Sequence, residues 1–331
     1  MIHLDNFRLS QTKELVIGDT VIEPNILNTV KIYAGKLPSD TRISVYAHVM
    51  HSVNPGPSLL VLGGVHGNEI NGIEIVRRSI EEKLYDGLQC GTVIVIPLLN
   101  IYGFINFSRS VPDGKDVNRS FPGHINGSLA SRVARIITKN ILPYIDVAID
   151  FHTGGDARFN YPQIRYAKSD LTAQSMANVF NTRYLIEQPL IPNSFRKSAK
   201  EQNVPAIVFE GGESIRLDTR TIQTGTDGIR RLLIELGLVE GVQEPELAER
   251  FVIHRTSWIR AASSGLFIWH RKSGEFVTKG DLLGEIKDPF GTKSLSVLAK
   301  TNGHIIGHNN ACVVSLGDAL FHIGQDFSVY R

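Results

Sequence analysis

The pattern of hydrophobic and polar positions changes along the chain and divides it into three parts. Between residues 12 and 52, three short segments alternate apolar and polar side chains, which predicts half-buried strands at 14–18, 29–35 and 42–50. The middle of the chain mixes apolar runs with helical periodicity, and the helical period disappears after about residue 250. We therefore predict a β-rich part over 1–57, an α/β core over 58–242 and a small all-β domain over 243–331.

Four apolar runs in the middle of the chain are nearly continuous, which is typical of strands that are covered on both faces. They lie at 58–64, 92–100, 145–151 and 205–210. Segments of helical period separate them, near 70–84, 128–141, 170–181 and 219–236. Ser128 precedes one of these helices as a suitable cap, and Asp218 or Thr219 begins another. This alternation predicts an α/β fold with a mostly parallel mixed sheet that is flanked by helices.

The last part of the chain contains a short repeat. The segments TKGDLLGEI (278–286) and SLGDALFHI (315–323) share the order of a glycine, an aspartate and a closing isoleucine. A repeated unit of strand, turn and strand favours a small β-sandwich or barrel. A polar stretch at 243–249 is the expected linker to it.

Composition excludes several classes of protein. The 331 residues include 35 Lys and Arg against 33 Asp and Glu, so the net charge of +2 predicts no nucleic-acid partner. Cys90 and Cys312 are the only cysteines, which excludes a disulfide framework and a cysteine zinc site. No apolar run approaches the roughly 18 residues that cross a bilayer, and residues 1–16 lack a signal-peptide pattern. We expect a cytoplasmic protein with no membrane partner, whose exposed β edges would allow a homo-oligomer.

A candidate metal site follows from the polar residues at two strand ends. The segment GGVHGNE (63–69) lies between an apolar strand and a helix, where His66 and Glu69 can point the same way. His152 follows the end of another apolar strand, so the three side chains form the set of two imidazoles and one carboxylate that suits a catalytic zinc. Asp150 precedes His152 by two residues and could accept the other imidazole N–H. Any one of these residues alone would more often be an ordinary surface or core side chain.

Two further segments carry candidate catalytic groups. In RSVPDGKDVNRSFPG (109–123), Arg109 could stabilise an oxyanion, and Asn118 with Arg119 could hold a substrate carboxylate. In VPAIVFEGGE (204–213), Glu210 ends an apolar strand and could act as general base and then acid. Glu213 is the alternative base.

Other polar and aromatic residues are expected to be structural. We interpret Arg158 and Arg196 as solvated loop residues. We interpret Trp258 and Trp269 as residues of core or interdomain packing.

Four sequence motifs and their order along the chain resemble those of the succinylglutamate desuccinylase/aspartoacylase family, which is related to the zinc carboxypeptidases. They are GGVHGNE, DVNRSFPG, DFHTGG and FEGGE, and they span about residues 58–213. The resemblance implies one Zn²⁺ per chain on His66, Glu69 and His152. It also implies Arg109 polarising the scissile carbonyl, Asn118 with Arg119 binding the amino-acid carboxylate, and Glu210 as base and acid. The C-terminal part resembles the barrel-sandwich fold of biotinyl and lipoyl domains.

The implied activity is that of a deacylase, a metal-dependent amidohydrolase that removes the acyl group of an N-acyl amino acid. Zinc would lower the pKa of the attacking water and polarise the amide carbonyl. A zinc carboxypeptidase acting on short peptides needs the same residues and is the first alternative. A non-catalytic binding protein that retains the fold is the second.

Overall fold

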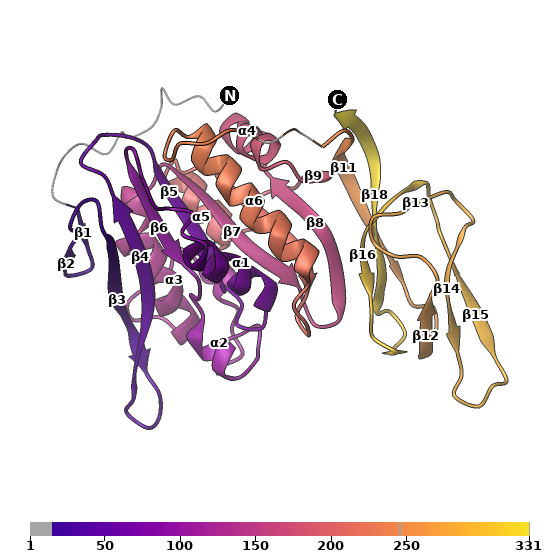
Figure 1. The fold of residues 1–331 in the computed structure, drawn as a ribbon. Helices are drawn as coiled ribbons and strands as arrows, with labels where there is room; N and C mark the ends of the chain where they lie inside the picture. The colour runs from indigo at the N-terminus through magenta and orange to yellow at the C-terminus, as the bar shows by residue number, and fades with distance from the viewer. Residues whose placement is uncertain (1–14, 244, 246, 331) are drawn as a thin grey trace.

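The computed structural model describes residues 15–243, 245 and 247–330. A large mixed sheet runs through this part of the chain (Figure 1). From one edge to the other its strands are β13 (Phe276–Val277), β16 (Gly303–Asn309), β18 (Ala319–Tyr330), β11 (Arg250–Arg260), β9 (Tyr184–Glu187), β8 (Arg158–Tyr166), β10 (Ala206–Glu213), β7 (Val147–Gly154), β5 (Ser58–Gly63), β6 (Thr92–Ile96), β4 (Arg42–His51) and β3 (Leu27–Lys36). The N-terminal residues 1–14 and two residues of the expected linker, 244 and 246, lie outside the described residues.

Four neighbouring parallel strands, together with the helices that pack on them, confirm the α/β fold. Strands β6, β5, β7 and β10 are parallel neighbours, and every residue of β5, β6 and β7 is buried. Successive side chains of a strand point to opposite faces of the sheet. Those of these strands accordingly enter two different apolar clusters, one on each face. Helices α3 (Leu129–Asn140) and α5 (Phe195–Glu201) contribute to one cluster. Helices α1 (Ile70–Glu81), α4 (Leu171–Phe180) and α6 (Thr219–Glu235) contribute to the other.

Local signals set the ends of these helices. The Ser128 hydroxyl accepts a hydrogen bond from the N–H of Ser131 at the start of α3. Asp218 does the same for Thr221 at the start of α6, and Gly237 follows that helix with φ of 67°. In the described part of the chain, the hydrophobic pattern does not predict α5 or the shorter helical segments α2 (Ile101–Ile105), η1 (Val117–Arg119) and η2 (Leu142–Tyr144).

The prediction of a mostly parallel sheet is not confirmed. Strand β8 leaves β7 through a tight turn and runs back, so it is antiparallel to β10. β9 and β11 are then parallel to β8, and β18 is antiparallel to β11. Because β16 pairs with both β18 and β8, these strands close on themselves in a barrel-like ring. The parallel pairing predicted from continuous apolar runs is therefore limited to two groups of strands, β6–β5–β7–β10 and β8–β9–β11.

The C-terminal segment adds a second sheet, whose strands in order are β15 (Ser294–Leu298), β14 (Leu282–Lys287), β12 (Gly265–Trp269) and β17 (Val313–Val314). It shares one apolar cluster with β11, β13, β16 and β18. The two copies of the sequence repeat make the same turn, in which Asp281 and Asp318 each accept from a backbone N–H three residues earlier. The three-part division of the chain and the barrel-sandwich resemblance stay predictions.

The N-terminal part adds a small hairpin of β1 (Val16–Ile17) and β2 (Thr20–Val21) beside the large sheet. Among the described residues, no helix has the length and apolar character required to span a membrane.

Candidate metal and catalytic site

The candidate site lies where the parallel strands end. His66 follows β5 in a short loop, Glu69 is the residue that caps the start of α1, and His152 is near the end of β7. The loop passes so close to α2 that a Cβ atom on Gly67 would stand 2.0 Å from the backbone carbonyl carbon of Gly103. Only glycine permits this approach, which brings the 66–69 turn against its neighbours.

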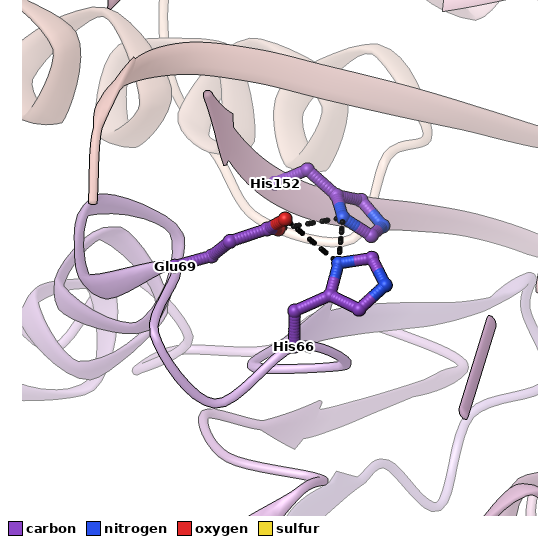
Figure 2. Close-up of side chains that lie close together, drawn as sticks. All are labelled: His66, Glu69 and His152. Carbon is purple, nitrogen blue, oxygen red and sulfur yellow. Dashed lines mark hydrogen bonds and ion pairs between the residues drawn. The ribbon is translucent and has the colours of Figure 1, made fainter. Parts of the chain in front are cut away.

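The three predicted ligands converge (Figure 2). The Nδ1 atom of His66 lies 2.7 Å from one oxygen of Glu69, and the Nδ1 atom of His152 lies 2.7 Å from the other. The two Nδ1 atoms are 3.2 Å apart. All three side chains are buried.

This donor set fits a divalent metal ion. Two imidazoles and one carboxylate are a ligand set of catalytic zinc. Two nitrogens that each stand about 2.0–2.1 Å from a tetrahedral zinc are about 3.3 Å from one another, close to the 3.2 Å observed between the Nδ1 atoms. The cluster could therefore hold such an ion with little movement of the side chains.

The Nε2 atom of each imidazole contacts a second carboxylate. Asp150 Oδ2 lies 2.7 Å from Nε2 of His152, as the spacing of two residues predicts. Asp116 Oδ1 lies 3.1 Å from Nε2 of His66, and its other oxygen accepts from Arg109. A carboxylate that accepts from Nε2 keeps the proton there and leaves Nδ1 free for a metal. Asp116 has no role in the sequence-based prediction, although it lies within the DVNRSFPG phrase.

Electrostatics favour a positive charge between these groups. Burial alone would raise the pKa of Glu69, but the two imidazoles hold it well below its usual range. Burial would lower the pKa of His152, whereas Asp150 and Glu69 raise it well above its usual value. The surroundings thus stabilise an ionised carboxylate beside a cation, which a bound metal ion would also provide.

Glu210 lies on β10 in register with His152 on β7. Its two oxygens contact Asn160 at 2.9 Å and Arg165 at 3.4 Å, both on β8. Glu210 lines the same cavity as the three candidate ligands, while Glu213 lines another cavity and is bound to Asn310 and Arg216. The placement therefore favours Glu210 over Glu213 as the carboxylate that shares a cavity with the candidate metal ligands.

The cavity has a volume of about 440 Å³ and is rich in arginine. Arg109 donates to Glu69 Oε1 at 3.2 Å, so its guanidinium is directly beside the three candidate ligands. Asn118 and Arg119 also line the cavity, and the amide oxygen of Asn118 is taken by the backbone N–H of Phe195. The Nδ2 group of Asn118 is the part of this side chain that can donate to a substrate.

The interpretation of one cavity residue, Arg196, is corrected. Arg196 is only 6% exposed, lies on α5 and lines the cavity, so it is not a solvated loop arginine. Burial and the neighbouring Arg165 lower its pKa to about 10, and its Nη1 atom is buried without a hydrogen-bond partner. Trp258 on β11 also lines the cavity while stacking on His322 at 4.2 Å between ring centroids. The sequence gives no local signal for Asn160 or Arg165, because their strand is not predicted.

Comparison with known proteins matches the sequence to one family. The model of the succinylglutamate desuccinylase/aspartoacylase catalytic domain matches residues 55–236. The N-alpha-acetyl-L-2,4-diaminobutyric acid deacetylase of Halomonas elongata is 26% identical over 308 residues, which are 88% of this chain and 90% of that protein.

Solved structures share the fold. A succinylglutamate desuccinylase/aspartoacylase from Rhodobacter sphaeroides has a TM-score of 0.82 at 21% identity, covering 96% of this chain and all of that one (100%). The product-bound ectoine utilization protein EutE (DoeB) from Ruegeria pomeroyi has a TM-score of 0.83 at 21% identity, covering 94% and 99%. Since the family model covers more than half of the sequence, the chain belongs to the succinylglutamate desuccinylase/aspartoacylase family.

Proposed function

We propose that this protein is a zinc-dependent hydrolase that removes the acyl group of an N-acyl amino acid. The observation that carries the proposal is the convergence of His66, Glu69 and His152 in one cavity with Glu210 and Arg109. The relative from Halomonas elongata is named as a deacetylase of an acetylated amino acid, which supports the same class of reaction.

The charges of the cavity suit an anionic substrate. Arg119 and Asn118 stand at its wall and together offer donors that match a carboxylate. Arg196 is buried in the same cavity wall, and its unpartnered Nη1 atom would gain from a negatively charged group. The volume of about 440 Å³ falls within the range of sites for small molecules.

Each residue then has a defined task in the reaction. A zinc ion held by the three ligands would supply Lewis-acid polarisation and lower the pKa of water to about 7. Glu210 takes the proton of the attacking water and passes it to the leaving amine nitrogen. Arg109 donates hydrogen bonds to the carbonyl oxygen as it gains charge. Asn118 and Arg119 hold the carboxylate so that the amide carbon faces the attacking oxygen.

The test is a substrate screen on protein loaded with zinc. N-acetyl and N-succinyl amino acids are compared with short peptides that end in the same amino acids. We expect turnover of N-acyl amino acids and loss of that turnover in Glu210→Gln, which should retain its zinc. Turnover of peptides alone would indicate a carboxypeptidase instead, and a fully active Glu210→Gln would show that the base is misassigned.

A further inference from the structure

Both carboxylate oxygens of Glu210 have their own donor, and both donors come from β8. Asn160 Nδ2 lies 2.9 Å from Oε2, and Arg165 Nη1 lies 3.4 Å from Oε1. Two contacts on different oxygens restrain the rotation of the carboxylate as well as its position. Each oxygen has a second lone-pair site, so the held carboxylate can still accept a proton, as a general base requires.

A β-bulge allows this arrangement. Asn160 and Arg165 are five residues apart, so a regular strand would direct them to opposite faces of the sheet. In the pairing of β8 with β10, however, Gln163 lies opposite Glu210 and Asn160 lies opposite Gly212. β8 therefore spans three residues where β10 spans two. The extra residue reverses the alternation and returns Asn160 to the face of Arg165, which is a known use of bulges beside active sites.

The three side chains of this contact are mostly buried in the wall of the cavity. The side chains of Glu210 and Arg165 are 16% and 17% exposed, and Asn160 is 7% exposed. Removal of either donor leaves a mostly buried carboxylate oxygen without its protein partner, so a change at either position should move the carboxylate.

The C-terminal segment supports the other side of Asn160. Gly307 on β16 is in register with Asn160, and the side chain of Gln163 on β8 contacts the carbonyl of Ile306 at 3.4 Å. A Cβ atom on Gly307 would stand 2.9 Å from Asn160 Oδ1, closer than ordinary contact. The absence of a side chain at residue 307 leaves the space that the Asn160 amide occupies.

We infer that Asn160 and Arg165 are positioning residues that hold Glu210 for proton transfer, and that β16 supports them through Gly307. This inference rests on the proposed function of Glu210. Proton transfer requires heavy atoms within about 2.6–3.2 Å, and a displacement of about 1 Å can cost about 100-fold in rate. Substrate binding is assigned to Asn118 and Arg119, so loss of the β8 donors should lower kcat and leave KM nearly unchanged.

The experiment compares variants at these positions as full-length, zinc-loaded protein. Asn160→Asp keeps the shape but turns a donor into a repelling carboxylate, and Arg165→Met removes the charge. Both should lower kcat about 10- to 100-fold with KM within about threefold. Arg165→Lys should recover most of kcat, and Gly307→Ala should lower kcat in the same direction. The control is Tyr161→Phe, since Tyr161 is on the same strand but lines the other cavity, and it should keep wild-type kcat.

Zinc content and the urea midpoint of each variant separate positioning from damage to the fold. Wild-type kcat in Asn160→Asp and Arg165→Met, beside an inactive Glu210→Gln, would overturn this inference and leave the proposed function intact. Variants that lose zinc and stability and show a raised KM, with no rescue by Arg165→Lys, would also overturn it, because they would show a structural role. A wild-type protein without turnover, or an active Glu210→Gln, would remove the proposed function and this inference together.

Discussion

Asp150→Asn should weaken zinc binding although Asp150 is not itself a ligand. The carboxylate of Asp150 lies 2.7 Å from Nε2 of His152 and its side chain is 1% exposed. As an acceptor it keeps the imidazole proton on Nε2, so that Nδ1 presents its lone pair to the metal. An asparagine amide can turn its NH₂ group toward Nε2 and favour the opposite tautomer, which places the proton on Nδ1.

The size of the effect follows from burial. Loss of a carboxylate partner behind a ligating histidine costs about 10- to 100-fold in metal affinity, or about 1.4–2.7 kcal/mol. No water can replace the buried Asp150 contact, so we expect the upper part of this range. Asp116 is 3.1 Å from His66 and its side chain is 20% exposed. Water can partly substitute for it, and Asp116→Asn should fall in the lower part of the range.

The assay is a competition titration of the metal-free protein against a zinc-binding dye. Asp146→Asn serves as the matched control, because Asp146 is also buried but binds Ser58 at the opposite end of the same strands. Zinc affinity within twofold of wild type in Asp150→Asn would refute the reasoning. Equal losses in Asp150→Asn and Asp146→Asn would do so as well, because they would indicate a general loss of structure.

Three further predictions concern catalysis, packing and pH. Arg109→Met should lower kcat about 100-fold with little change in KM, as for loss of an oxyanion donor; steady-state kinetics that show only a higher KM would contradict this. Gly67→Ala should cost about 1–3 kcal/mol of stability and weaken zinc binding, because its Cβ would overlap the backbone of Gly103; an unchanged urea midpoint would speak against it. Burial lowers the pKa of His308 to about 4 and that of His322 to about 3. Between about pH 6.5 and 4 the unfolded chain therefore binds protons that the folded chain does not. The unfolding free energy should then fall with falling pH by up to about 1.4 kcal/mol per unit for each histidine. Urea midpoints from pH 7 to 4.5 measure this slope, and His308→Gln should reduce it.

The convergence of the three candidate ligands is predictable because its signals are local. His66 and Glu69 occur together between a strand and a helix, and His152 follows the end of a second strand. Parallel strands bring their carboxyl ends to one edge, so the topology of the central block is enough to bring the three side chains together. Asp150 follows from the same argument, since it is two residues from His152.

Strand β8 and its side chains are not predictable in this way. The segment RFNYPQIRY contains Pro162 and few apolar residues, and proline within a run argues against a strand. Its polar side chains are buried because they meet Glu210 and the cavity, which the hydrophobic pattern cannot represent. Asn160, Arg165 and the closure of the sheet by β16 therefore appear only in three dimensions. The direction of β8, and with it the mixed character of the sheet, follows from a turn rather than from strand composition.

The central claim is that His66, Glu69 and His152 bind one divalent ion, and a crystal of the zinc-loaded protein measured at the zinc absorption edge tests it directly. The account predicts one anomalous peak per chain, about 2.0–2.1 Å from the Nδ1 atoms of both histidines and beside the Glu69 carboxylate. A peak bound by other residues, or no peak at full zinc loading, would contradict it.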